Sequence, residues 1–259
     1  MSETIHHAAQ AGFSSHAQQY QLARPHYPEQ IVAWLKQHIA LDRHSTVVDV
    51  GSGTGKFLPY LQQSQAKVIA VEPIAEMLQQ LQQAHPDITA YQADSQHLPF
   101  ADATVDLISC AQSFHWFDNI ATLQEFHRIL KPQGHLLLVW NQRDISVPWV
   151  QALAEQIAQY EADTPRYHSE NWKKVFQQQD FFQALGSSHF ALYHEGRVQD
   201  VVSQRLLSTS FIAAMPQAQQ QQLKQQFESI VQHYTQQGPE DQIAFPYTTY
   251  LYHFQKTES

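Results

Sequence analysis

An apolar run that breaks into three alternating glycines constrains this chain more than any other feature. The chain reads Val-Val-Asp-Val over 47–50 and Gly-Ser-Gly-Thr-Gly over 51–55. A β-branched run predicts a buried parallel strand, and alternating glycines predict a loop whose backbone lies against a ligand. A second apolar run, 68–71, ends in the acid Glu72. The pattern predicts an α/β fold that binds a nucleoside-containing cofactor.

The spacing of the glycines bears on which cofactor this is. A dinucleotide-binding loop has the spacing G-x-G-x-x-G, whereas here the third glycine, Gly55, comes one residue early. Glu72 still suits a ribose, because an ionised carboxylate accepts hydrogen bonds from two vicinal hydroxyls. NAD therefore stays open as an alternative ligand, and with it an oxidoreductase activity.

Further segments extend this pattern over roughly residues 45–142, in the order of a known family. After the glycine loop and Glu72 come the segment 93–100, the strand and loop 105–116, and the segment 128–134 before a last apolar strand. Together they resemble the class I S-adenosylmethionine-dependent methyltransferases. The resemblance implies an α/β Rossmann-like fold with a mostly parallel seven-stranded sheet, helices on both faces and a helical cap insertion. It also implies S-adenosyl-L-methionine as cofactor and S-adenosyl-L-homocysteine as product.

The resemblance implies roles for several acids. Glu72 is expected to hold the ribose, Asp94 to accept from the adenine amino group, and Asp49 to meet the methionyl ammonium directly or through water. Asp94 has an ordinary alternative role, because Asp is also typical of turns and helix caps. The complete set of expected cofactor contacts is Tyr20, Arg24, Asp49, Gly51, Ser52, Gly53, Gly55, Glu72, Pro73, Met77, Asp94, Ser95, Gln96, Gln112 and His115.

His115 is the candidate catalytic residue. It follows the predicted strand 105–110, where the related enzymes place the residues nearest the transferred methyl group. A histidine has an ordinary pKa near neutrality and so suits a general base. The alternative is that the aromatic segment 114–117 only walls the cofactor pocket.

The N-terminal segment has a resemblance of its own. Tyr20, Arg24 and Tyr27 resemble a segment of a methyltransferase subgroup that includes trans-aconitate methyltransferase-like proteins. In this reading Tyr20 closes over the methionyl end, and Arg24 pairs with a carboxylate of cofactor or substrate. The alternative is a surface turn made rigid by its prolines.

Composition limits the class of partner. The chain has 259 residues and a net charge of −9. Because nucleic-acid binding draws much of its affinity from Lys and Arg, this charge favours a small-molecule acceptor over nucleic acid. The 16 histidines are scattered apart from His6 and His7, so we expect no metal site, and Cys110 is expected in the core. No leader or membrane span is visible, which predicts a soluble cytoplasmic monomer or homodimer.

We expect one methyltransferase domain over 1–259, with an N-terminal helical lid over 1–44. The cofactor-binding core covers 45–142, and 143–259 supplies the cap insertion and completes the sheet. Alternating apolar patterns predict βαβ units and therefore a parallel sheet. A first helix is predicted to begin at Pro28. Predicted strands cover 45–50, 67–71, 88–92, 105–110, 134–140, 188–195 and 247–254. The other predicted helices cover 56–64, 74–84, 119–130, 148–160, 170–178, 197–213 and 216–236.

The sequence indicates less about the methyl acceptor than about the cofactor. A mixture of aromatic and polar residues follows the fifth strand, and it suits either an aromatic or carboxylated small molecule or ordinary packing. These residues are Trp140, Asn141, Arg143, Trp149, Arg166 and Tyr167. Transfer of a methyl group from S-adenosylmethionine to an oxygen of a small molecule is the predicted function. The alternatives are a non-catalytic sensor or scaffold that keeps the cofactor pocket, and an NAD-dependent oxidoreductase.

Overall fold

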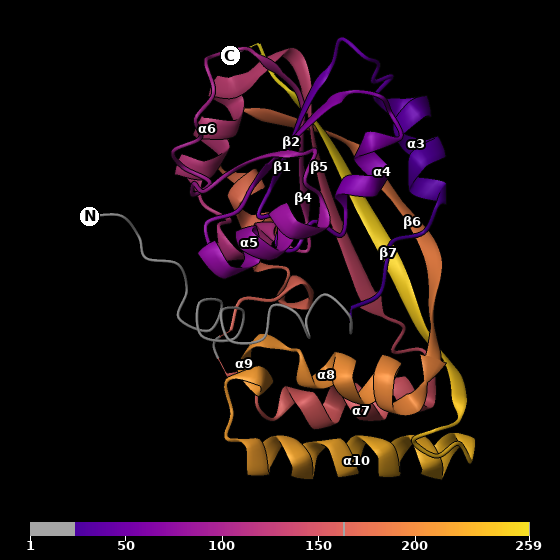
Figure 1. The fold of residues 1–259 in the computed structure, drawn as a ribbon. Coiled ribbons are helices and arrows are strands. Elements are labelled where there is room, and N and C mark those ends of the chain that lie inside the picture. The colour runs from indigo at the N-terminus through magenta and orange to yellow at the C-terminus, as the bar shows by residue number, and fades with distance from the viewer. Residues whose placement is uncertain (1–23, 163, 259) are drawn as a thin grey trace. The chain divides into compact units, whose positions relative to one another are not determined.

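The computed structural model describes residues 24–162 and 164–258. The chain forms two compact units, which we describe one at a time (Figure 1). The larger unit consists of the described residues within Tyr27–Trp140, Pro165–Phe190 and Thr249–Ser259, and the smaller unit of those within Met1–His26, Asn141–Thr164 and Ala191–Thr248. The sequence prediction of one domain with a lid and a cap stays a prediction.

The strands form a seven-stranded sheet in the order β3-β2-β1-β4-β5-β7-β6. Its first five members pair in parallel, with β1 next to β2 and β4, β2 next to β3, and β4 next to β5. The predicted mostly parallel sheet is confirmed. The strands are β1 (Thr46–Val50), β2 (Lys67–Val71), β3 (Thr89–Tyr91), β4 (Val105–Ala111), β5 (Leu130–Arg143), β6 (Phe182–Arg197) and β7 (Gln242–Lys256).

Alternate residues of these strands face two separate apolar clusters in the larger unit. Val48 of β1 belongs to one cluster, which includes Phe126 of helix α6 (Ile120–Ile129). Val47 belongs to the other, which includes Leu35 of α3 (Gln30–His38) and Leu58 of α4 (Leu58–Gln62). Successive side chains of a strand point to opposite faces. The sheet of the larger unit is therefore covered by helices on both faces, which is typical of a buried parallel sheet.

Local sequence explains where the helices of the larger unit begin. Asn119 caps α6, because its side-chain oxygen accepts from the Thr122 backbone N–H at 3.0 Å. Pro28 accepts from the Ile31 N–H just before α3, and the helix predicted to begin there is confirmed. The helices are α3 (Gln30–His38), α4 (Leu58–Gln62), α5 (Ala75–Ala84), α6 (Ile120–Ile129) and the 3₁₀ segments η1 (Phe114–Trp116), η2 (Tyr167–Ser169) and η3 (Asn171–Gln177).

The smaller unit is mainly helical and has an apolar cluster of its own. Trp149, Leu206, Phe227 and Tyr247 are among the buried members of this cluster. No helix among the described residues is both long enough and apolar enough to cross a membrane. The helices of this unit are α7 (Pro148–Ala158), the π-helix η4 (Gln199–Gln204), α8 (Arg205–Leu207), α9 (Ser210–Ala213) and α10 (Gln217–Thr235).

Two predicted helices differ from the structure. The segment 170–178 forms the 3₁₀ segment η3 in place of an α-helix. The segment 197–213 is divided into η4, α8 and α9. The division has a local cause, because the Ser208 hydroxyl donates to the Arg205 carbonyl at 2.7 Å and Thr209 then has extended backbone angles. Side-chain hydrogen bonds of Ser and Thr to nearby backbone compete with a continuous helix.

Candidate functional site

The predicted site residues of the larger unit lie where the parallel strands end. The Gly51 and Ser52 N–H groups both donate to the Val71 carbonyl, at 2.9 and 3.1 Å. This pairing brings the glycine loop, which follows β1, against the end of β2, where Glu72 begins the next segment. Ligands of parallel α/β sheets bind beyond the carboxyl ends of the strands. The register of the sheet therefore assembles the glycines and Glu72 at the expected edge.

Gly51, Gly53 and Gly55 all have positive φ angles but differ in what surrounds them. A Cβ built on Gly51 would lie 2.6 Å from the Ser113 Cβ, so this position packs tightly against the loop after β4. A Cβ built on Gly53 meets no atom within 4 Å. Gly53 is thus the position where the loop backbone is open to a ligand.

Glu72 is buried and holds the loop through both carboxylate oxygens. Its Oε2 accepts from the Gly53 N–H at 2.8 Å, and its Oε1 accepts from the Ile74 N–H at 2.9 Å. Burial raises the pKa of Glu72 to about 7, against the lowering effect of these two N–H donors and with a smaller contribution from nearby Asp49. Each carboxylate oxygen has two acceptor positions, so Glu72 keeps acceptor capacity for further donors.

Asp49 is a second buried acid and lies on β1, the strand that pairs with β2, whose end Glu72 follows. Its Oδ1 accepts from the Ser109 hydroxyl of β4 at 2.5 Å. Its Oδ2 is enclosed and has no hydrogen-bond partner among the described residues. Burial raises the pKa of Asp49 to about 7 despite the hydrogen bond from Ser109. A buried acceptor without a donor is costly, and a cationic group of a ligand would satisfy it.

These raised pKa values predict how the stability of the free protein changes with pH. The folded state holds a proton on Asp49 up to about pH 7, whereas the unfolded chain loses it near its ordinary value of 3.8. The free energy of unfolding should therefore fall as pH rises through this window, by an amount on the order of 1 kcal/mol or more. In Asp49→Asn that fall should shrink, because the amide does not titrate and its oxygen can still accept from Ser109.

Urea unfolding at pH 5 and pH 8 without ligand checks this prediction. Asp49→Asn should gain stability relative to the natural protein as the pH rises, while Asp87→Asn, at an exposed acid of the same unit, should follow the natural protein. If the free energy of unfolding changed by the same amount between pH 5 and pH 8 in all three proteins, Asp49 would not titrate in this range.

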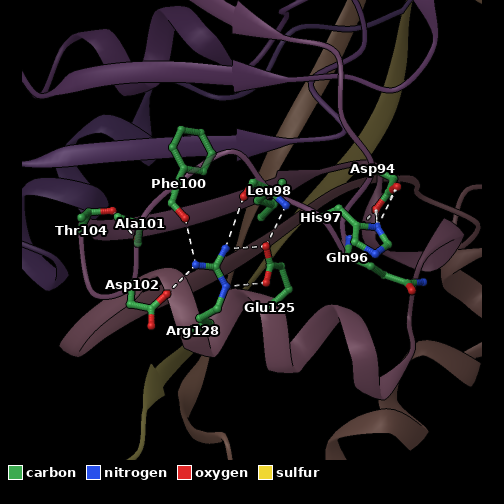
Figure 2. Close-up of polar contacts among 10 residues, drawn as sticks. All are labelled: Asp94, Gln96, His97, Leu98, Phe100, Ala101, Asp102, Thr104, Glu125 and Arg128. Atoms are coloured by element: carbon green, nitrogen blue, oxygen red, sulfur yellow. Dashed lines mark hydrogen bonds and ion pairs between the residues drawn. The ribbon is translucent and has the colours of Figure 1, made fainter.

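Asp94 lies on the segment after β3 and is exposed. Its carboxylate accepts from the Gln96 N–H at 2.8 Å and pairs with the His97 ring, as Figure 2 shows. This is the turn-forming role that Asp commonly has. The Ser95 side chain is buried and shares a 2.9 Å hydrogen bond with the Thr122 hydroxyl of α6. The adenine role of this segment stays a prediction.

Arg128 fixes the same segment to α6 (Figure 2). Its guanidinium donates to both Glu125 carboxylate oxygens at 2.7 Å, to Asp102 at 2.6 Å and to the Phe100 carbonyl at 2.9 Å. Glu125 in turn accepts from the Leu98 N–H at 2.7 Å. Residues 98–102 are thereby held by a planar donor that a lysine could not replace. The sequence pattern places Arg128 only at the start of the segment 128–134, and no local signal predicts this bracing role.

His115 lies in the loop after β4 and is half-buried. Its Nδ1 atom accepts a 3.1 Å hydrogen bond from the Trp140 indole N–H. An indole nitrogen is only a donor, so a neutral His115 carries its proton on Nε2. In this tautomer Nε2 donates, whereas a general base needs a free lone pair. The catalytic role of His115 stays a prediction, and the observed geometry favours positioning.

The other predicted cofactor contacts are distributed as follows. Met77 is buried on α5, and the Ser52 hydroxyl donates to the Asp49 carbonyl at 2.7 Å. The Pro73 carbonyl accepts from the Gln92 side chain at 3.1 Å. Gln112 has a φ of 61° and donates its N–H to the Val139 carbonyl. Tyr20 lies outside the described residues.

Arg24 belongs to the smaller unit. Its Nε and Nη2 atoms donate to the Ser208 hydroxyl and carbonyl, at 3.2 and 3.0 Å. The predicted acceptor residues are divided between the units. Trp140, Arg166 and Tyr167 belong to the larger unit, and Asn141, Arg143 and Trp149 to the smaller.

Trp140 and Tyr167 belong to a packed aromatic group. Their ring centroids lie 5.1 Å apart, and Trp172 lies 4.6 Å from Trp140. The Tyr167 and Tyr252 hydroxyls are 2.6 Å apart, and Trp140 is fully buried. The packing alternative therefore explains these aromatic residues. Among the described residues, no group of three or more His, Cys, Asp or Glu side chains is arranged to hold a metal ion.

Comparison with known proteins identifies the family. Residues 48–138 match the methyltransferase domain family. A methyltransferase-like protein of Schizosaccharomyces pombe is 32% identical over 247 residues, which cover 94% of this chain and 95% of that protein. A malonyl-[acyl-carrier protein] O-methyltransferase of Pectobacterium atrosepticum is 33% identical over 107 residues, 41% of each chain.

The fold agrees with this relationship. A protein from Anaeromyxobacter dehalogenans, whose structure is described as that of a candidate type II methyltransferase, has a TM-score of 0.67 and 20% identity. The match covers 90% of this chain and 97% of that one. The chain belongs to the class I S-adenosylmethionine-dependent methyltransferases, as its motifs predict. The comparisons do not distinguish the trans-aconitate methyltransferase-like subgroup.

Proposed function

We propose that the protein transfers the methyl group of S-adenosylmethionine to an oxygen atom of a small molecule. The observation that carries the proposal is the buried Asp49 Oδ2, which has no hydrogen-bond partner among the described residues and lies on the strand that leads into the loop with the open Gly53 backbone. An unsatisfied buried carboxylate oxygen fits a cofactor that brings its own positive charge. The name of the Pectobacterium relative supports oxygen as the acceptor atom.

The bound cofactor would supply a sulfonium-activated methyl group, so the protein mainly has to position the reactants and exclude water. Glu72 would accept from the ribose hydroxyls with the acceptor positions that its two backbone donors leave open. Asp49 would accept from the methionyl ammonium through Oδ2. The segment from Asp94 to Gln96, braced by Arg128, would lie against the adenine.

An acceptor carboxylate would need no general base, because it is ionised at neutral pH. His115, held by Trp140 with its proton on Nε2, would then orient the acceptor as a donor. For a carboxylate acceptor we expect kcat to be independent of pH between about 6 and 9 and to fall less than about tenfold in His115→Ala. A limb in the pH profile of kcat that disappears in His115→Ala would instead establish His115 as the base.

The proposed activity is tested with S-adenosylmethionine that carries a deuterated methyl group. The protein is incubated with a panel of carboxylic acids, phenols and amines, and mass spectrometry follows both the labelled product and S-adenosylhomocysteine. A labelled methyl ester or ether is expected, and its formation should be lost in Asp49→Asn. Label on nitrogen alone would contradict the choice of oxygen, and tight cofactor binding without any labelled product would favour the sensor alternative.

A further inference from the structure

The imidazole ring of His85 packs against Gly55, the third glycine of the loop after β1. A Cβ built on Gly55 would lie 2.6 Å from the His85 Cδ2 atom and 2.8 Å from its Nε2 atom. The Cδ1 atom of Leu58 would lie 3.0 Å from the same Cβ. Because protein interiors are close-packed, a residue larger than glycine does not fit beneath this ring without a shift. The contact adds to the φ of 86°, which by itself favours glycine at this position.

His85 is held at the C-terminal end of α5 by hydrogen bonds of its own backbone. Its N–H donates to the Leu81 carbonyl at 2.8 Å, and its carbonyl accepts from the Ile88 N–H at 3.1 Å. The side chain is half-buried. Burial lowers the pKa of the His85 ring, and a polar interaction with the Gly55 backbone, which favours the protonated form, opposes this lowering in part. The ring is therefore neutral at pH 7 and meets Gly55 from a fixed point.

Gly55 connects the loop to the helix that follows it. Its N–H donates to the Ser52 carbonyl at 2.9 Å, and its carbonyl accepts from the N–H of Leu58, the first residue of α4, at 3.1 Å. A shift of Gly55 would therefore move both the loop backbone around Ser52 and the start of α4. A contact that holds Gly55 in place also fixes this end of the loop.

Each glycine of the loop is held by a different part of the larger unit. Gly51 packs against the loop after β4, and the Gly53 N–H donates to Glu72, which follows β2. Gly55 packs against His85 at the end of α5. Glycine loses more conformational freedom than any other residue when it is fixed, so contacts that order this loop before a ligand arrives lower the entropic cost of binding.

We propose that His85 is a positioning residue of the cofactor site. It acts through Gly55, because its ring holds the end of the loop and so keeps the Gly53 backbone arranged for the cofactor before the cofactor binds. Without the ring, Gly55 would move more freely, and the cost of ordering the loop would reduce the affinity for the cofactor. This inference rests on the proposed function, because it takes the loop to be the place where S-adenosylmethionine binds.

Calorimetric titration with S-adenosylhomocysteine compares the natural protein with three variants. His85→Ala should bind about tenfold more weakly, because the loop loses its contact at Gly55. His85→Gln should bind within about threefold of the natural protein, since its amide keeps an N–H donor and fills much of the same space. Gln83→Ala, at an exposed position of the same helix, should bind normally. Urea unfolding without ligand checks that each variant folds. If His85→Ala does not fold, His85→Asn replaces it, because its shorter side chain also leaves Gly55 uncovered.

A double-mutant cycle with Gly55→Ala separates positioning from a general loss of stability. Gly55→Ala alone should weaken S-adenosylhomocysteine binding, because its new Cβ collides with the His85 ring and displaces the loop. In the Gly55→Ala background, His85→Ala removes the collision and should leave the affinity unchanged or raise it. In the natural background the same substitution should cost about tenfold, so the two effects are not additive.

Three outcomes would overturn the inference. They are normal S-adenosylhomocysteine affinity in His85→Ala or its Asn replacement, binding by His85→Gln that is no tighter than that of His85→Ala, and additive effects in the cycle with Gly55→Ala. Failure of the proposed function gives a different result, because the natural protein itself would then not bind S-adenosylhomocysteine.

Discussion

Glu72→Gln is expected to weaken S-adenosylhomocysteine binding by about a hundredfold. The Glu72 carboxylate accepts from the Gly53 and Ile74 N–H groups, at 2.8 and 2.9 Å. An amide has only one oxygen, so its NH₂ group must face one of these N–H donors. The loop would shift away from this clash, and the two ribose hydroxyls would lose a charged acceptor, worth about 1.5–3 kcal/mol per hydrogen bond.

Calorimetric titration of S-adenosylhomocysteine measures this effect. Binding is the proper readout, because the change in folding stability is the difference of two opposed effects. Burial raises the pKa of Glu72 to about 7, so Gln relieves the cost of a buried charge at pH 8 while it loses a backbone hydrogen bond. Glu29→Gln, the same exchange at an exposed position, should bind normally. Normal affinity in Glu72→Gln would remove Glu72 from the ribose role.

Gly51→Ala is expected mainly to lower the stability of the fold, whereas Gly53→Ala is expected mainly to weaken cofactor binding. Gly51 has a φ of 68°, and a new Cβ would lie 2.6 Å from the Ser113 Cβ. Left-handed strain and overpacking together should lower the free energy of unfolding by about 3 kcal/mol. Gly53 has a φ of 57° and no atom within 4 Å of a built Cβ, so alanine should cost only about 1 kcal/mol there.

The substitution that costs less folding stability, Gly53→Ala, should have the larger effect on ligand affinity. The methyl group of Gly53→Ala would occupy the open space beside the loop backbone, and the affinity for S-adenosylhomocysteine should fall about thirtyfold, or about 2 kcal/mol. Urea unfolding and calorimetry on both variants give the comparison. If Gly53→Ala bound as tightly as the natural protein, the open side of the loop would not be where the cofactor lies.

Local patterns were sufficient to predict much of the fold. The β-branched runs around Val48 and Ile69 predict strands because such residues pack well on a pleated, buried surface. The position of Glu72 could also be predicted, since parallel strands end at the same edge of a sheet and Glu72 directly follows β2. Cys110 is fully buried, as its apolar neighbours predict.

Contacts between distant residues could not be predicted in this way. The hydrogen bond from Ser109 to Asp49 depends on the register of β4 against β1, which no local pattern specifies. The tautomer of His115, in η1, depends on Trp140, which lies 25 residues further along the chain on β5. Arg205 reads as an ordinary polar position of a helix, and only the packing around it shows that its Nε and Nη1 atoms are enclosed without a hydrogen-bond partner among the described residues.

Calorimetric titration of the natural protein with S-adenosylhomocysteine and with NAD tests the central claim most directly. The early third glycine and the buried acids Asp49 and Glu72 predict binding of S-adenosylhomocysteine at a ratio of one to one and no measurable heat with NAD. Binding of NAD without binding of S-adenosylhomocysteine would contradict the account.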